Sequence, residues 1–438
     1  MPHPPDDVRR AIAAVWRLEA PRVIGRAGRL LRDIGLAEEA AQDALVAALE
    51  TWPRDGMPVN PAAWLMTAAQ RRALDLLRRA RLAAGKAGEL GRELDFLHAA
   101  ASDDQAEAVD ARLDDAIGDD LLRLIFTACH PLLPPESRAA LTLRVMGGLT
   151  TPEIARAYLK PEAAIAQRIV RAKRTLAAAR IPCELPPGGQ LRARLASVLE
   201  VIYLMFNEGY AATAGDDWLR PALGEEALRL GRVLAGLMPG ASEVHGLVAL
   251  MEIQASRFAA RVAPDGAPVL LLDQDRRRWD RLLIRRGLDA LARAEALAGG
   301  AGPGVYTLQA GIAACHARAA RVEDTDWPRI VGLYDALDQL APSPVVRLNR
   351  AVAVAQAYGP AAALELVDAL GDEPALRGYH LLPAVRGDLL LRLGRFAEAR
   401  AEFTRAAALT RNGREHALLM RRANAAGTPG PSHPMDPD

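Results

Sequence analysis

Apolar residues recur at intervals of three and four along almost the whole chain of 438 residues. That spacing places them on one face of an α-helix, so the chain is a succession of amphipathic helices. Runs that alternate apolar and polar residues, which are typical of half-buried strands, are nearly absent, and aromatic residues make up only 4% of the chain. The pattern predicts an all-α fold.

Segments of different composition interrupt the helical pattern and predict the domain boundaries. From Gly85 to Leu121 there are eleven acidic and three basic residues, a net charge of −8, which suits a solvated spacer with little core of its own. The stretch "CELPPGG" breaks the pattern again, and the last residues are rich in proline. The predicted parts are a helical domain at 7–81, an acidic linker at 82–118, a second helical domain at 119–182, a third at 188–426 and a disordered tail at 427–438.

The stretch "TTPEIARAYLKPEAAIAQRIVRAKRTL" predicts two short helices joined by a tight turn. Thr150 and Glu153 have the spacing of a capping box at the start of the first helix, with Ile154 and Ala155 facing inward. Pro161 stands where a proline favours the start of the second helix. Intervals of four, three and four give that helix one buried stripe, formed by Ile165, Ile169, Ala172 and Leu176.

The outward face of this second helix is cationic, although the whole chain carries a net charge of only +1. A helix with small and polar residues near its start and cations further on suits the major groove of DNA. The same pattern is also typical of an ordinary solvated helix face, and the pattern alone does not decide between these two interpretations. The candidate DNA-binding residues of this segment are Lys160, Ala163, Gln167, Arg168, Arg171, Lys173 and Arg174.

Several motifs, taken in their order, resemble one family. "EIARAYLKPEAAIAQRIVRAKRTL" resembles the carboxy-terminal helix-turn-helix of the extracytoplasmic-function (ECF) sigma factors of the sigma-70 family. "AEEAAQDALVAALETW" resembles the helix of that family that binds core RNA polymerase, and "NPAAWLMTAAQRRALDLLRR" resembles the helix that opens the promoter. The stretches "DDLLRLIFTACHPLL", "IYLMFNEGY" and "DGAPVLLLDQDRRRWD" are similar to the subgroup with a large C-terminal helical extension. The resemblance implies a promoter-specificity subunit without catalytic activity.

The resemblance also implies roles for residues of the first domain. On the helix from Ala37 to Leu49, it implies contacts with the polymerase by Glu38, Glu39, Gln42, Asp43 and Leu45. It implies that the loop from Pro53 to Asn60 traps a base of the minus-ten element, and that phosphates of that strand are held by Arg71, Arg72, Arg78 and Arg79. Trp52 and Trp64 either stack on bases or pack, and packing is favoured for Trp64 because it lies within an apolar helical pattern.

The chain departs from the family pattern at two places. Gln70-Arg71 stands where most relatives have Arg-Asn in the promoter-opening helix, which puts the base contacts in doubt. Leu159-Lys160 replaces the usual Gly-Val before the recognition helix. We therefore expect an altered turn, because a side chain makes the left-handed backbone costly.

The third domain contains internal repetition. Gly359 precedes Gly394 by 35 residues, and similar small and large residues follow each of them. Stacked helix pairs of this type form a solenoid, and their concave groove takes a peptide or a partner helix. The positions that match a tetratricopeptide hairpin are Gly387, Leu390, Gly394, Ala399, Phe403 and Ala406.

Two Cys-His pairs and one cluster of Asp and Arg residues could suggest a metal site or a catalytic site, but their spacing favours neither. Adjacent Cys and His side chains, at Cys129-His130 and Cys315-His316, point about 100° apart on a helix and lack the spacing of a chelate, so neither a metal nor a cofactor is expected. In "DQDRRRWD", we expect Arg276–Arg278 to be neutralised in an interhelical ion-pair network by Asp273, Asp275 and Asp280.

Three cysteines and the lack of an apolar leader or a long uncharged apolar run favour a cytoplasmic protein. Two other functions remain open: a helix-turn-helix regulator with a tetratricopeptide sensor, and, least favoured, an enzyme that uses the Asp273, Asp275 and Asp280 cluster. The expected partners are core RNA polymerase, promoter DNA with minus-thirty-five and minus-ten elements, and a protein or peptide in the solenoid groove.

Overall fold

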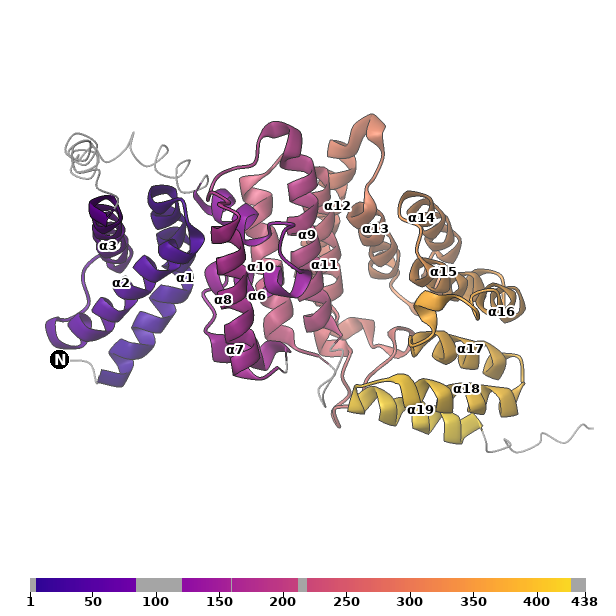
Figure 1. Ribbon diagram of the computed structural model, residues 1–438. Coiled ribbons are helices and arrows are strands. Elements are labelled where there is room, and N and C mark those ends of the chain that lie inside the picture. Colours follow the sequence, from indigo (N-terminus) through magenta and orange to yellow (C-terminus); the bar gives the residue numbers. More distant parts are fainter. Residues whose placement is uncertain (1–4, 84–119, 159, 212–218, 427–438) are drawn as a thin grey trace, which may run out of the picture. The chain divides into compact units, whose positions relative to one another are not determined.

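The computed structural model describes residues 5–83, 120–158, 160–211 and 219–426. Most of these residues are helical, and within them the only β-type pairing is an isolated bridge between Val262 and Pro268 (Figure 1). The predicted all-α fold is confirmed. Nearly all of the acidic linker, Leu159 of the turn and the tail lie outside the described residues. Among the described residues, no helix is both long and apolar enough to cross a membrane.

The chain divides into two compact units, Met1–Leu204 and Met205–Asp438, and the boundary between them falls within the sequence of helix α9 (Gly188–Tyr210). In the first unit, α1, α2 and α3 pack on one another, and α6, α7 and α8 form a second group. Residues 120–128 are also helical. The remaining helices of this unit are α1 (Pro5–Leu31), α2 (Ile34–Asp55), α3 (Pro61–Ala83), α6 (Pro135–Val145), α7 (Thr151–Tyr158) and α8 (Glu162–Ala178).

Helix α2 begins at a side-chain cap and continues further than the sequence predicts. Asp33 accepts hydrogen bonds from the backbone N–H groups of Gly35 (2.7 Å) and Leu36 (2.9 Å), which satisfies two donors at the helix start. The prediction that the loop begins at Pro53 is wrong, because α2 continues through Asp55. The fixed φ of proline is compatible with a helix, and the helix ends only where Gly56 adopts a φ of 86°.

The two helices of the predicted helix-turn-helix are confirmed, as α7 and α8, while the altered turn predicted at Leu159 lies outside the described residues. The backbone N–H of Thr150 donates to Glu153 (2.8 Å), and the N–H of Glu153 donates to the Thr150 hydroxyl (3.4 Å), so both halves of the capping box form. Pro161 is the N-cap residue of α8. Lys160 is not among the described residues with a positive φ. The side chains predicted to be inward are all buried: Ile154, Ala155, Ile165, Ile169, Ala172 and Leu176.

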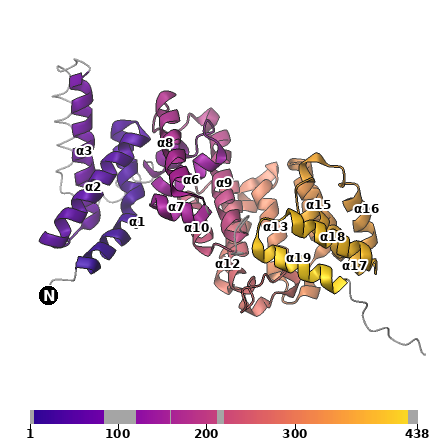
Figure 2. The same cartoon turned by 60° about the horizontal axis from the view of Figure 1, so that its bottom comes forward.

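In the second unit, each helix from α13 to α19 packs against the next one along the chain, as in a solenoid (Figures 1 and 2). Helix α11 packs on α10, α12 and α13. The helices are α10 (Pro221–Leu237), α11 (Ser242–Ala255), α12 (Arg281–Ala298), α13 (Val305–Arg318), α14 (Trp327–Leu340), α15 (Pro344–Ala357), α16 (Pro360–Asp368), α17 (Leu381–Arg392), α18 (Phe396–Leu409) and α19 (Gly413–Ala426).

The hairpin of α17 and α18 packs through a glycine and an aromatic ring. A Cβ on Gly387 would lie 3.0 Å from the ring of Phe403, so a larger residue there would displace the ring. Phe403 is fully buried, as are the other predicted packing positions Leu390, Ala399 and Ala406. Gly359 and Gly394 have φ values of 98° and 76°, which L side chains rarely adopt, directly before α16 and in the turn before α18.

Replacing the buried ring tests this packing. Phe403→Ala should lower the free energy of unfolding by about 3–5 kcal/mol, because it leaves a cavity between α17 and α18. Phe396→Ala is the matched control, since Phe396 is 54% exposed at the start of the same helix. Urea unfolding followed by circular dichroism measures both. Equal stability of the two variants would contradict this packing.

Candidate nucleic-acid interface

The face of α8 opposite its buried stripe is open to solvent. Ala163, Gln167, Arg171 and Arg174 are exposed and follow one another at helical spacing, and Lys160 is exposed just before the helix. The buried stripe fixes this orientation, because rotating α8 would expose Ile165 and its companions. The helix therefore presents a row of small, polar and then cationic side chains.

Two further cations of α8 have intramolecular partners. The Arg168 guanidinium pairs with Glu136 at the start of α6 (2.5 Å), and the Lys173 ammonium pairs with Glu38 of α2. Both side chains are partly buried. Their contact with DNA therefore stays a prediction that requires these pairs to be exchanged for phosphate or base contacts.

A groove of about 470 Å³ runs beside the outward face of α8. One wall comes from Leu133, Pro134 and Ser137, at the turn before α6 and in its first residues. The other wall comes from α8 and carries the amide of Gln167 and the guanidinium of Arg171. The groove thus brings hydrogen-bond donors and a positive charge to one concave surface, which suits the edge of a nucleic acid backbone.

On α2, the predicted polymerase-binding residues have different surroundings. Glu39 is exposed, while Gln42, Asp43 and Leu45 are partly exposed. Glu38 is buried, with 4% of its surface exposed. The same helix also exposes large apolar side chains that the sequence reasoning did not single out, namely Leu36, Val46 and Leu49.

The arginines of α3 divide into paired and unpaired groups. Arg72 reaches back to Asp43 of α2 (2.5 Å), and Arg78 pairs with Asp75 one turn earlier (3.2 Å). Arg71 and Arg79 are exposed, and no ion pair joins them to another residue of the described part of the chain. Among the arginines of α3 whose side chains are described, these two are the exposed ones.

Trp52 and Trp64 pack against each other. Their ring centroids are 5.4 Å apart at an interplanar angle of 74°, an edge-to-face arrangement. Trp52 is only 1% exposed and Trp64 is partly buried. Packing, the interpretation favoured for Trp64, therefore holds for Trp52 as well.

In the second unit, two of the quoted motifs meet in one buried cluster. Tyr210 of "IYLMFNEGY" lies under the Arg261 guanidinium, with 3.7 Å from the guanidinium carbon to the ring centroid. The Arg257 guanidinium lies over both Tyr210 and Trp279, which comes from "DQDRRRWD". Gly209 allows α9 and α10 to approach, because a Cβ there would lie 2.3 Å from a backbone nitrogen. The two motifs thus form a cation–π core.

The expected ion-pair network of "DQDRRRWD" is wrong in most of its members. Only Asp275 and Arg277 pair, and they do so locally (3.1 Å). Asp280 instead caps α12 by accepting from two backbone N–H groups. Arg276 is buried and donates to the carbonyls of His316 (2.8 Å) and Ala319 (2.6 Å). Arg276 and Asp280 therefore form their hydrogen bonds with backbone carbonyl and N–H groups, and not with the opposite charges of this motif.

In each Cys-His pair, at least one side chain is buried and has a shifted pKa. Burial raises the pKa of Cys129 to about 12, and its thiol lies 3.3 Å from the Thr142 hydroxyl. Burial, together with the charges of Arg257 and Arg276, lowers the pKa of His316 to about 3. No group of three or more His, Cys, Asp and Glu side chains that could hold a metal ion occurs in the described residues.

Three segments of the chain match known protein families. Residues 15–82 match the model of sigma-70 region 2, and residues 123–176 match that of sigma-70 region 4. Residues 194–295, which include α10 and α11, match a family of unknown function (DUF6596). The region 2 match covers all of α2 and all of α3 except its last residue, and the region 4 match covers α6, α7 and most of α8.

Among curated relatives, the ECF RNA polymerase sigma factor SigK of Mycobacterium tuberculosis (strain H37Rv) is 33% identical over 170 residues, which are 38% of this chain and 83% of SigK. SigK of Mycobacterium ulcerans (strain Agy99) is 34% identical over 33% of this chain and 73% of its own length. The chain belongs to the ECF sigma factors.

This protein is therefore an alternative sigma factor for transcription initiation, and its family is not an enzyme family. The similarity to "Uncharacterized protein R00370" of Rhizobium meliloti (strain 1021) is 47% identity over 91% of this chain and 92% of the relative, so it includes the C-terminal helices. No solved structure gives a significant match.

Two substitutions on α8 separate backbone contact from base reading in this sigma factor. Arg174→Ala should weaken binding to all promoters alike and reduce the slope of log affinity against log salt by about 1, because a phosphate contact carries no sequence information. Gln167→Ala should change the preferred sequence instead. Fluorescence anisotropy of the holoenzyme on a promoter panel at several salt concentrations measures both effects.

Arg400→Ala is the control for the charge change, since it removes one exposed cation from α18 in the second unit. Promoter affinity equal to the unaltered protein for both α8 variants would exclude this face as the contact surface.

Proposed function

We propose that this sigma factor directs core RNA polymerase to specific promoters, with α8 on the minus-thirty-five element and α3 with the loop before it on the minus-ten element. The observation that carries this assignment is the cationic, solvent-exposed row on α8 opposite a fully buried stripe. On α3, the free charges of Arg71 and Arg79 suit the phosphates of the opened strand. The corrected loop for the unstacked base is 56–60.

For core polymerase, we propose the exposed face of α2. It combines the carboxylate of Glu39 with the apolar side chains of Val46 and Leu49, a mixture that suits a partner helix. An exposed apolar group on a charged helix is typical of a protein-protein contact. An independent helix-turn-helix regulator has no use for such a face, so α2 separates the two functions.

We further propose that the C-terminal helices are tetratricopeptide-like and complete the active holoenzyme. Support comes from the α17–α18 hairpin, whose glycine and ring pack as the repeat requires. The first residues of the predicted extension at 188–426 pack with the preceding domain. Arg138 of α6 donates to Ser197 (2.5 Å) and Glu200 (2.9 Å) of α9, so the first half of α9 completes the fold of the region 4 segment.

The α2 face is tested by adding a charge. Val46→Asp should weaken binding to core polymerase by roughly tenfold, because it places a carboxylate in a contact that is apolar at its centre. Leu18→Asp is the control, since Leu18 is 73% exposed on the neighbouring helix α1. A pull-down with purified core polymerase, followed by a transcription assay, measures the effect. Equal binding by both variants would remove α2 from the proposal.

The extension is tested by truncation after Leu204, where the first compact unit ends. If the extension completes the holoenzyme, the shortened chain should fold and bind core polymerase but lose nearly all promoter-specific transcription. Circular dichroism and the pull-down establish the first two properties. Higher transcription than the full chain would instead indicate masking, and equal transcription would show that the extension has no part in initiation.

A further inference from the structure

Arg257 is a buried cation for which the described part of the chain provides no hydrogen-bond acceptor. It lies just after α11, and only 5% of its surface is exposed. Its guanidinium carbon is 5.6 Å from the ring centroid of Tyr210 and 5.7 Å from that of Trp279. Its Nε atom is buried without a partner. The two rings attract the charge, but they do not replace the hydrogen bonds to water that a guanidinium loses on burial.

Two neighbouring side chains have the same deficit. The Arg276 guanidinium carbon lies 5.1 Å from the ring centroid of Trp279, and Arg276 is 6% exposed. Although Arg276 also donates to backbone carbonyls, its Nε is buried without a partner, as is Nε1 of Trp279. All of these unpartnered atoms are N–H donors, which native proteins rarely leave unpaired. The side chains of Arg257, Arg276 and Trp279 are called the arginine cluster below.

The arginine cluster carries positive charge without a carboxylate. Among the described residues, neither Arg257 nor Arg276 has a carboxylate as an ion-pair partner. Three acidic residues that lie close to them in the sequence have other partners, since Glu252 pairs with Arg232 (2.8 Å), Asp275 pairs with Arg277 (3.1 Å) and Asp280 caps α12.

Neighbouring groups respond to this charge. Burial and the charge of Arg257 lower the pKa of Arg276. Burial, together with the charges of Arg257 and Arg276, lowers the pKa of His316 to about 3. The imidazole of His316 is therefore neutral at pH 7 and adds no further charge. The cluster thus has two buried charges that repel each other and an unfilled demand for an anion.

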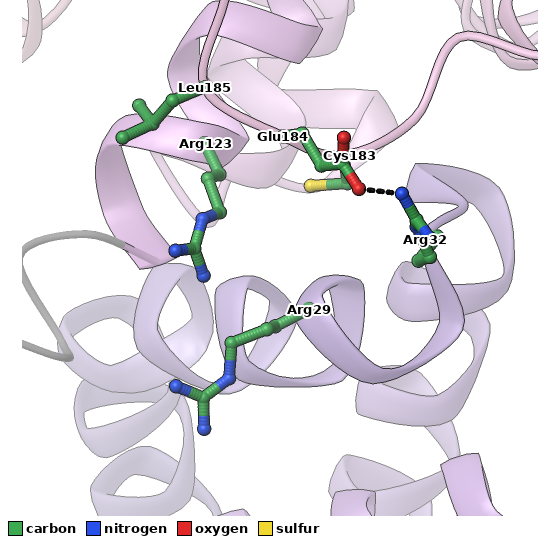
Figure 3. A pocket seen from close by; sticks show the side chains of 6 residues that line it. All are labelled: Arg29, Arg32, Arg123, Cys183, Glu184 and Leu185. Carbon is green, nitrogen blue, oxygen red and sulfur yellow. Dashed lines mark hydrogen bonds and ion pairs between the residues drawn. The ribbon is translucent and has the colours of Figure 1, made fainter.

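Arginines that gather at another place in the chain do have carboxylate partners. Figure 3 shows a pocket of about 290 Å³ that is lined by Arg29, Arg32 and Arg123. Arg32 pairs with Glu184, while Asp120 pairs with Arg123 (3.1 Å) and with Arg29 (3.7 Å). The chain supplies counter-charges in this pocket, which makes the lack of them at the arginine cluster more informative.

We propose that the arginine cluster binds an oxyanion, a phosphate or carboxylate group of a small molecule, which accepts hydrogen bonds from Arg257 and neutralises its charge. A guanidinium suits both groups, because its N–H donors lie in one plane and form a fork. The cluster is not sealed, since a small part of Arg257 and of Arg276 remains exposed. The second unit then has a ligand site of its own, and this inference does not depend on the proposed function.

Calorimetric titration of the full chain tests this site. With inorganic phosphate as the probe, in a buffer without phosphate or carboxylate, the unaltered protein should show saturable binding of one ion per chain. A parallel titration with acetate at the same ionic strength distinguishes a phosphate site from a carboxylate site. Saturable binding of neither anion would overturn the proposal.

Arg257→Met removes the charge and keeps an unbranched, adaptable side chain between the two rings. It should weaken binding of the anion by at least about tenfold, because charge-assisted hydrogen bonds are lost. Arg277→Met is the matched control, since Arg277 belongs to the same motif but is exposed and pairs locally with Asp275. Equal affinity of the two variants for the anion would contradict a site at Arg257.

A purely structural cation–π contact gives a different result in urea unfolding. In that case, Arg257→Met would lower the urea midpoint by the same amount with and without the anion. If the anion binds at the cluster, it should raise the midpoint of the unaltered protein and of Arg277→Met by more than that of Arg257→Met, because a ligand stabilises only a fold that binds it. The comparison between variants also removes the general effect of the salt.

Amide hydrogen exchange of the unaltered protein locates the anion even if Arg257→Met does not fold. A saturating concentration of the anion should slow exchange in residues 256–262 and 274–281, which carry the arginine cluster. Slower exchange at residues 29–32 and 120–123 instead would place the anion in the pocket of Figure 3. That result, or unchanged exchange in every segment, would overturn the proposal.

Discussion

A carboxylate can be buried only where cations or hydrogen-bond donors replace the water that it loses, and Glu38 meets this condition through Arg144 and Lys173. These two partners come from α6 and α8, while Glu38 belongs to α2. The packing of the first unit therefore depends on a charge that neither segment could bury alone. Breaking the contact would return three charges to water.

The same competition for partners shapes the second unit. Arg276 is buried because backbone carbonyls accept its N–H groups, and Arg261 is buried against the ring of Tyr210. Glycines also contribute to the packing of this unit. Gly209 allows the backbone of α10 to approach, and Gly387 allows the ring of Phe403 to approach. A chain with few aromatic residues can thus build a core from rings, glycines and arginine stems.

The segment that matches the family of unknown function acquires a physical description from this arrangement. It begins within α9, whose first half satisfies Arg138 of the region 4 segment and whose last turn carries Tyr210 of the cation–π core. This continuity is a structural reason for the region 4 segment and the following helices to occur in one chain.

The sequence by itself determined the features that depend on neighbours three or four residues apart: the all-α fold, the capping box of Thr150, the buried stripe of α8 and the packing positions of α17 and α18. These are local, because helix periodicity and caps involve residues within one or two turns. Only the tertiary structure decided which charges meet. Glu38 was expected on an outward face and is buried against residues more than 100 positions away, and the buried Arg276 donates to carbonyls 40 and 43 positions further along the chain. Partners so distant in the chain are chosen by packing, which composition and spacing do not encode.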